Sequence, residues 1–142
     1  MNPDQSLFQA AATGSVSLAK TACAAGARPT AIGPGGATAL HIAASQGHNH
    51  VAEFLLAGGA DPNAQDAFGR TPLHEAAFVR SKSPEIWETL LTHGADPHGP
   101  PDRDGRTPEA LAMTLDYGHA LKRLTEQNAE RVARGQEPSL GR

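Results

Sequence analysis

The sequence predicts an all-α solenoid, a stack of about four helical hairpins, and three observations support this fold class. A turn followed directly by a helix start occupies residues 69–77, and the same pattern occupies residues 36–44. Many other positions repeat at this 33-residue interval. The third observation is composition: 39% of the residues are hydrophobic, but the chain has only 4 Phe, 1 Trp and 1 Tyr. Small apolar side chains suit thin stacked layers better than one deep core.

The helix start at residue 71 shows what the pattern encodes. Thr71 is a good N-cap, because its hydroxyl accepts a hydrogen bond from an unpaired backbone N–H of the first turn. Pro72 follows at the first helical position, where its fixed φ suits the helix and its missing N–H has no consequence. Leu73, Ala76 and Ala77 then fall on one side of the helix. This helix is therefore predicted to pack one apolar face against its neighbours.

A 33-residue shift brings identical residues into register along the first half of the chain. The coincident pairs are Leu7 and Leu40, Ala10 and Ala43, Gly14 and Gly47, Gly26 and Gly59, Ala27 and Ala60, Pro29 and Pro62, and Ala31 and Ala64. A fixed period of this length is the signature of a repeat architecture. We therefore expect one repeat domain over residues 1–134 and a polar C-terminal tail over residues 135–142. The repeats are expected at about residues 4–32, 33–65, 66–101 and 102–133.

Each repeat is expected to contain a helix, a short turn, a second helix and an extended loop. The first repeat has Gln5-Ser6 where later repeats have the Thr-led cap, and its inner helix is predicted from Leu7 to Thr13. The segment over residues 26–38 holds several Gly and Pro residues, so it is predicted to be an extended excursion with turns. This first repeat would close one end of the stack.

The third and fourth repeats follow the same plan with changes. Two residues are added between the helices of the third repeat, within residues 78–85. There Ser83 is predicted to cap the second helix and Pro84 to start it. In the fourth repeat Thr107 caps the inner helix, and a closing helix is expected over residues 119 to about 133. The second helices of the middle repeats are expected to pack through Val51, Phe54, Leu55, Leu56, Ile86, Trp87, Leu90 and Leu91.

These motifs resemble those of the ankyrin repeat family over about residues 4–130. The matching segments are Thr71-Pro72-Leu73-His74, Gly47-His48, Gly59-Ala60-Asp61 and Gly94-Ala95-Asp96. The departures are the missing proline after Thr38, the lengthened third repeat without Gly-His, and Glu109-Ala110 in place of Leu-His. The resemblance implies stacked helix pairs with hairpin-like loops along one edge. It also implies protein binding on the concave side, which the loop tips and inner helices form.

Charge and composition argue against several function classes. The formal net charge is −3 with His neutral, so no overall basic field indicates nucleic acid. One cysteine excludes an internal disulfide and favours a reducing compartment. The N-terminus lacks the features of a secretion signal, and no apolar run approaches the roughly 20 residues of a membrane span. We therefore expect a cytoplasmic monomer, and the preference for Arg over Lys together with abundant Ala suggests a bacterial source.

No set of residues predicts catalysis, a metal or a cofactor. His48 and His50 are the nearest histidine pair, but a zinc site needs three or four ligands, and no third ligand has matching spacing. Cys23 aligns with Leu56 and is interpreted as a small buried apolar residue. His41 and His74 match the repeat pattern and are expected to hydrogen-bond within their own turns. The sequence therefore predicts a protein that is not an enzyme.

Residues that the repeat pattern leaves free are candidates for binding a partner. Those on the predicted concave side include Ile42, Ser45, Gln46, Val79, Asp104, Leu111 and Thr114. The candidate contact residues are Phe68, Arg70, Glu75, Phe78, Arg103 and Arg106. An aromatic residue on a hairpin tip, flanked by Arg70 and Arg106, has the composition of a binding hot spot. Alternatively Phe68 folds back onto the neighbouring repeat, and the sequence does not decide between the two orientations.

The leading hypothesis is a non-enzymatic protein–protein interaction module that binds an unidentified partner protein through these six residues. An adaptor, an inhibitor, an immunity-type protein and a host-directed effector all fit it. The rival is a metal- or redox-linked ligand-binding protein that uses His48, His50 or Cys23. A third alternative is a structural module that associates with itself through its exposed ends. The repeat format is compatible with many surfaces, so the sequence does not name the partner.

Overall fold

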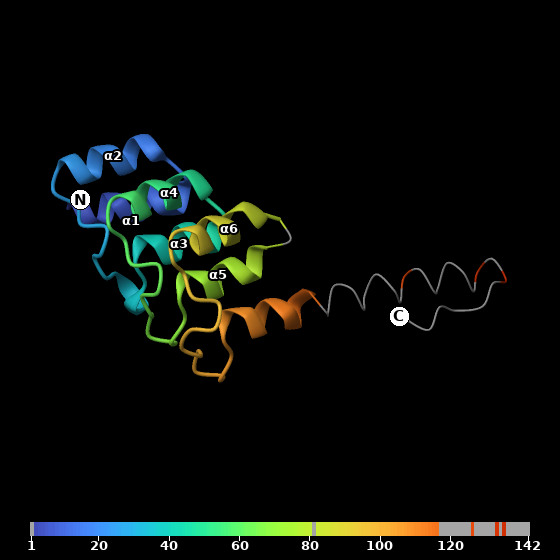
Figure 1. Ribbon diagram of the computed structural model, residues 1–142. Coiled ribbons are helices and arrows are strands. Elements are labelled where there is room, and N and C mark those ends of the chain that lie inside the picture. The colour runs from blue at the N-terminus through green and yellow to red at the C-terminus, as the bar shows by residue number, and fades with distance from the viewer. Residues whose placement is uncertain (1, 81, 117–125, 127–132, 134, 136–142) are drawn as a thin grey trace.

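The computed structural model describes residues 2–80, 82–116, 126, 133 and 135. Three helix pairs stack along the chain, and a further helical segment at residues 108–116 follows them (Figure 1). The pairs are α1 (Pro3–Thr13) with α2 (Val16–Ala24), α3 (Ala39–Gln46) with α4 (Asn49–Ala57), and α5 (Pro72–Val79) with α6 (Pro84–Thr92). Helices α1, α3 and α5 pack in one layer, and α2, α4 and α6 pack in the other. The predicted all-α solenoid is confirmed.

The predicted helix start at Thr71 is also confirmed. Thr71 Oγ1 accepts a hydrogen bond from His74 N at 3.4 Å, and His74 Nδ1 accepts one from Thr71 N at 3.0 Å. Thr38 and His41 form the same reciprocal cap at the start of α3, where no proline follows the threonine. The cap therefore depends on the Thr and His pair, and Pro72 adds only a favourable φ.

The first helix begins earlier than the sequence predicted. We expected it from Leu7, but α1 begins at Pro3. Asn2 Oδ1 accepts a hydrogen bond from Gln5 N at 2.8 Å, and Gln5 Oε1 accepts one from Asn2 N at 3.1 Å. Gln5 is therefore the third residue of the helix and closes a capping box with Asn2, so it does not replace the cap residue itself.

The second helix of the third repeat starts at the predicted residues but without the predicted cap contact. Ser83 is the N-cap of α6 and Pro84 its first residue, yet the Ser83 side chain makes no cap hydrogen bond. It lies against the preceding repeat instead, since a Cβ added at Gly47 would meet Ser83 Oγ at 2.5 Å. The Ser83 side chain therefore contacts the end of α3 rather than the first turn of its own helix.

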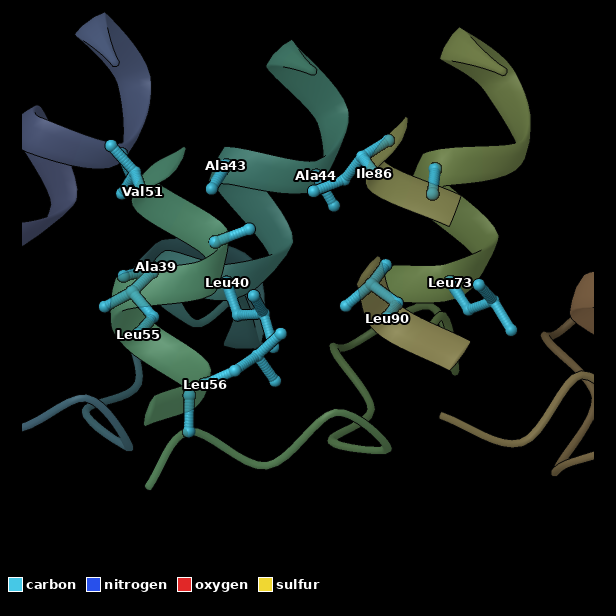
Figure 2. Close-up of a cluster of buried hydrophobic side chains, with 14 of the residues drawn as sticks. Ala39, Leu40, Ala43, Ala44, Val51, Leu55, Leu56, Leu73, Ile86 and Leu90 are labelled. Atoms are coloured by element: carbon cyan, nitrogen blue, oxygen red, sulfur yellow. The ribbon is translucent and has the colours of Figure 1, made fainter. Parts of the chain in front are cut away.

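A thin core of aliphatic side chains holds the two helical layers together (Figure 2). The larger members are fully buried: Leu7, Leu40, Val51, Leu55, Leu73, Ile86 and Leu90 are each 0% exposed. Burying one such side chain contributes about 1.5–3 kcal/mol. Alanines such as Ala43, Ala44 and Ala76 separate them and let neighbouring helices approach closely. Trp87 is 6% exposed and packs in this core, as the sequence predicted.

Hairpin-like loops connect the repeats and lie along one edge of the stack (Figure 1). We call residues 33–37, 66–70 and 102–106 the first, second and third tips. In each tip a backbone hydrogen bond joins the first residue to the last, from Gly33 N to Ala37 O, from Asp66 N to Arg70 O, and from Asp102 N to Arg106 O. The segment over residues 26–38 is mostly extended, as predicted, with one three-residue 3₁₀ turn, η1 (Pro34–Gly36).

Buried histidines connect one repeat to the next. His41 Nε2 lies 2.8 Å from Arg70 O, and His74 Nε2 lies 2.8 Å from Arg106 O. Since a carbonyl only accepts, Nε2 carries the proton and Nδ1 is free to accept from the threonine, which corresponds to neutral imidazole. Burial lowers the pKa of His41 from its usual 6.5, which also favours this form. Each ring therefore joins its own helix start to the following tip.

Some predictions fall on the last part of the chain. The closing helix expected over residues 119 to about 133 lies almost entirely outside the described residues, and the tail at 135–142 does so except for residue 135. Within the part of the chain that the structure describes, none of the helices has the length and apolar character needed to cross a bilayer.

Candidate protein-binding surface

Six residues predicted to contact a partner come from two tips and one inner helix. Phe68 and Arg70 lie on the second tip, Arg103 and Arg106 on the third, and Glu75 and Phe78 on α5. We call this set the tip–α5 surface. Figure 1 shows the two tips next to each other at the lower edge of the stack, with α5 above them in this view.

Aspartates give the second and third tips the same backbone shape. Asp66 Oδ1 accepts hydrogen bonds from Phe68 N at 2.8 Å and from Arg70 N at 3.0 Å. Asp102 Oδ1 accepts the equivalent bonds in the third tip, from Asp104 N at 3.0 Å and Arg106 N at 2.9 Å. An aspartate that bonds backbone groups two and four residues later fixes a tight turn. The two tips are therefore preorganised before any partner arrives.

The third tip packs directly on the second. Arg103 N donates to Phe68 O at 3.0 Å, and the Arg103 guanidinium carbon lies 5.7 Å from the centre of the Phe68 ring. Phe68 is 55% exposed. Of the two orientations that the sequence left open, the structure therefore shows the exposed one, with an arginine over the ring.

A second arginine covers a second phenylalanine. The Arg70 guanidinium carbon lies 5.1 Å from the centre of the Phe78 ring, and Phe78 is 44% exposed. Cation–π contacts at exposed sites contribute about 0.5–1 kcal/mol each. The sequence placed Arg70 beside Phe68, whereas the structure places it along α5 above Phe78.

Glu75 lies half-buried between these elements. Burial raises the pKa of its carboxyl group; the charge of Arg70 acts in the opposite direction, and Asp66 adds to the rise. Because the rise prevails, burial of the charged carboxylate outweighs the attraction of Arg70. Ionised Glu75 therefore stabilises the fold less than protonated Glu75 does.

Comparison with known proteins identifies the fold family. A family model described as ankyrin repeats, in three copies, matches residues 7–100, which is more than half of the chain. The chain belongs to the ankyrin repeat family. No curated protein gives a significant match to it. Ankyrin repeats are generally protein–protein interaction modules and are typically non-enzymatic, so the family agrees with the coarse function that the sequence predicted.

The ankyrin match ends before the expected fourth repeat. At that repeat Thr107 Oγ1 accepts a hydrogen bond from Ala110 N at 3.2 Å, and residues 108–116 are helical. Ala110 replaces the histidine of the earlier repeats, so the threonine cap remains but the link to a further tip is lost. The cap and this helix support the proposal that a fourth ankyrin repeat begins here, and the rest of its expected range to residue 133 lies almost entirely outside the described residues.

The Arg106 side chain contacts carboxylates of the third tip, whereas Arg70 and Arg103 are the arginines that lie over the exposed rings. Arg106 Nη2 donates to Asp104 Oδ2 at 3.0 Å, and its Nε lies 3.7 Å from Asp102 Oδ2. Burial would raise the pKa of Asp102, but the backbone N–H groups of Arg106 and Asp104, with the Arg106 charge, together lower it. The guanidinium of Arg106 is thus held by two carboxylates of its own tip.

The sequence also misplaced one surface residue and missed two others. Leu111, expected on the binding side, is 1% exposed, while Met113 is 64% exposed. The repeat register could not reveal this, because Met113 aligns with Ala77, which is 4% exposed. Arg80, also overlooked, lies 4.9 Å from the centre of the Trp87 ring.

The residues that a metal- or redox-linked site would use have other contacts or lie apart from one another. His48 Nδ1 lies 2.8 Å from Ala11 O, and His50 Nδ1 lies 3.9 Å from a carboxylate oxygen of Glu53. Cys23 is partly buried against the core, and burial raises the pKa of its thiol. Over the described ranges of the chain, no three His, Cys, Asp or Glu residues gather as metal ligands would. These positions give the alternative no geometric support.

Proposed function

We propose that this ankyrin chain binds one partner protein through the tip–α5 surface and acts as an adaptor, an inhibitor or an immunity-type protein. The observation that carries the proposal is the pair of exposed rings, Phe68 and Phe78, each covered by an arginine. Among the described residues Ile32 and Met113 are the other exposed large apolar side chains, so what distinguishes this edge is two aromatic rings with an arginine over each.

The energetics of association favour this surface. Aromatic and arginine side chains dominate binding hot spots, because they bury much area at a low entropy cost. Here the backbone bond from Arg103 to Phe68 and the Asp66 turn already fix the tips. A partner would therefore order few side chains on binding, which increases the affinity for a given contact area. We place this activity in the cytoplasm and in a monomer, consistent with a single cysteine that is partly buried.

The proposal is tested by comparing the proteins that the wild-type chain and a surface variant capture. Immobilised wild-type chain and the double variant Phe68→Ala/Arg70→Ala are exposed to the same native lysate, and bound proteins are quantified by mass spectrometry. We expect the specific partner to fall by more than tenfold on the variant, since hot-spot truncations remove about 2 kcal/mol or more each.

The matched control is Lys20→Ala, because Lys20 is exposed on α2, away from both tips. Far-UV circular dichroism verifies that every variant keeps the wild-type helix content. A partner captured equally by the wild type and by Phe68→Ala/Arg70→Ala would exclude the tip–α5 surface as its binding site.

A further inference from the structure

We propose that the partner segment bound by the tip–α5 surface is acidic, with Asp or Glu side chains beside an aromatic or aliphatic one. This inference rests on the proposed function and adds the chemistry of the partner. It follows from which arginines of the surface already have carboxylate partners and which do not.

Two of the four arginines in this region are paired within the chain. Arg106 bonds Asp104 at 3.0 Å, and Arg80 Nη1 bonds Asp116 Oδ2 at 2.9 Å. Arg70 and Arg103 have no carboxylate oxygen within 4.0 Å of their nitrogens among the described residues. Both of them lie over exposed rings instead.

The nearby carboxylates are already committed. Asp66 Oδ1 accepts two backbone N–H groups of its own tip, and the Asp102 side chain is only 1% exposed. Asp104 is exposed but holds Arg106. Glu75 is half-buried beneath Arg70, and burial raises the pKa of its carboxyl group. What this surface presents without a carboxylate within 4.0 Å, among the described residues, is therefore the two guanidinium groups of Arg70 and Arg103.

The stacked geometry suits a carboxylate. A guanidinium whose central carbon lies 5.1 or 5.7 Å from a ring centre, as in Arg70 and Arg103, still has N–H groups that can bind a carboxylate through two parallel hydrogen bonds. The exposed parts of Phe68 and Phe78 remain available for an apolar side chain next to the acid. A partner segment that combines both groups would satisfy the arginines and bury the rings.

A nucleic acid fits these observations less well. Its binding relies on several phosphate contacts at once, whereas this surface offers two unpaired arginines. The whole chain also carries a net charge of −3, which repels a polyanion more strongly than it repels a short acidic segment.

The experiment is the selection of a displayed random peptide library on the immobilised full chain. We expect enriched peptides that contain Asp or Glu together with Phe, Tyr, Trp or Leu. The affinity of such a peptide should fall by about tenfold or more on Arg70→Glu/Arg103→Glu, because two attractive charges become repulsive. Selection on that double variant should enrich Lys and Arg instead. Lys20→Glu reverses a charge on α2 and should change the affinity less than about twofold.

The possible results separate this inference from the proposed function. Neutral or basic peptides that require Phe68 and Phe78 but not the two arginines would overturn the acidic partner and leave the binding surface intact. Peptides that tolerate both Phe68→Ala/Phe78→Ala and Arg70→Glu/Arg103→Glu, or no enrichment at all, would count against both. A single-stranded oligonucleotide that binds more tightly than the acidic peptides, and only when Arg70 and Arg103 are present, would also overturn the inference.

Discussion

The buried imidazole ring of His74 joins the start of its own helix to the next repeat. Its Nδ1 accepts the N–H of Thr71 at 3.0 Å, and its Nε2 lies 2.8 Å from Arg106 O in the next repeat. The side chain is completely buried. Loss of the ring would leave a buried backbone N–H and a carbonyl without their partners, and would open a cavity beside them.

We expect His74→Ala to lower the free energy of unfolding by about 3 kcal/mol, from the lost hydrogen bonds and the cavity together. Equilibrium urea unfolding would measure the change. His93→Ala removes an exposed histidine at the end of α6 and should change stability by less than about 0.5 kcal/mol. Equal losses in the two variants would show that the inter-repeat bond contributes little.

Glu75 gives a prediction with a definite pH dependence. Burial raises its pKa above the usual 4.5, so the folded chain binds this proton more tightly than the unfolded chain does. The stability of the wild type therefore decreases as the pH rises above 4.5 and through the raised pKa of Glu75. A neutral glutamine at this position does not titrate, so its contribution to stability does not change with pH. Glu75→Gln should therefore raise Tm at pH 7, and the difference should close as the pH falls below 4.5. A constant difference from pH 7 to pH 4, or a lower Tm at pH 7, would contradict this account.

The sequence did not predict the contacts that the residues of the tip–α5 surface make with one another. It leaves two orientations open for Phe68, because the direction of a side chain on a tip depends on the neighbouring tip. The backbone bond that settles it comes from Arg103, 35 residues later, and no local pattern encodes it. The sequence likewise places Arg106 beside Phe68, whereas Asp102 and Asp104 hold it. The role of these residues in binding stays a prediction.

At the scale of elements, the tips stack on one another through their backbones. Ala67 N in the second tip donates to Gly35 O in the first at 2.9 Å. The approach is close because Gly36 has no side chain: a Cβ added there would lie 2.9 Å from Ala67 N. Gly35 has almost the same φ, +72° against +74°, but open space around it. Substituting each glycine in turn therefore separates the cost of the steric contact with Ala67 from the cost of a side chain at positive φ.

We expect Gly36→Ala to destabilise the fold by about 1–2 kcal/mol more than Gly35→Ala, since the added methyl group must displace backbone in one case only. Both changes carry the same penalty for positive φ, of about 1 kcal/mol, and it cancels in the comparison. Urea unfolding of the two variants provides the measurement. Equal destabilisation would show that the first and second tips do not need to be in contact.

Helix starts were predictable where the cap follows the repeat pattern. Thr71 with Pro72 is found as expected, because all the groups involved lie within four residues. The start of α1 was wrong because Asn2 and Gln5 form a capping box outside the repeat register. The Ser83 cap was wrong in its contact, because the longer connection places Ser83 against Gly47 of another repeat. The sequence therefore predicted the caps that follow the repeat pattern, and it did not predict contacts between repeats.

At the scale of the whole molecule, the main contacts between the six helices α1 to α6 join helices of the same repeat or of adjacent repeats. Helix α3 packs against α1, α4 and α5, whereas α2 at the edge of the stack packs against α1 and α4. A stack of this kind has a stability that is nearly a sum of repeat terms and interface terms. Helices with more interfaces should consequently open less often.

Native-state hydrogen exchange would test this gradient. We expect the backbone amides of α3 to exchange more slowly than those of α2, with α5 close to α3, because opening α3 breaks two inter-repeat interfaces. Mass spectrometry of overlapping peptides resolves these helices. Uniform protection along α1 to α6 would mean that the stack opens only as a single cooperative unit.

The connection from α5 to α6 is where an engineer would graft new sequence. It has four residues, 80–83, where the connection from α3 to α4 has only Gly47 and His48. His48 there bonds back to Ala11 O, and its counterpart Ser83 makes no cap hydrogen bond. The chain has thus already accommodated two additional residues here, with Ser83 packed against Gly47 in place of the histidine hydrogen bond. Each further doubling of the loop would cost only about 0.6 kcal/mol, so an epitope or a small folded insert could be carried there while both layers keep their contacts.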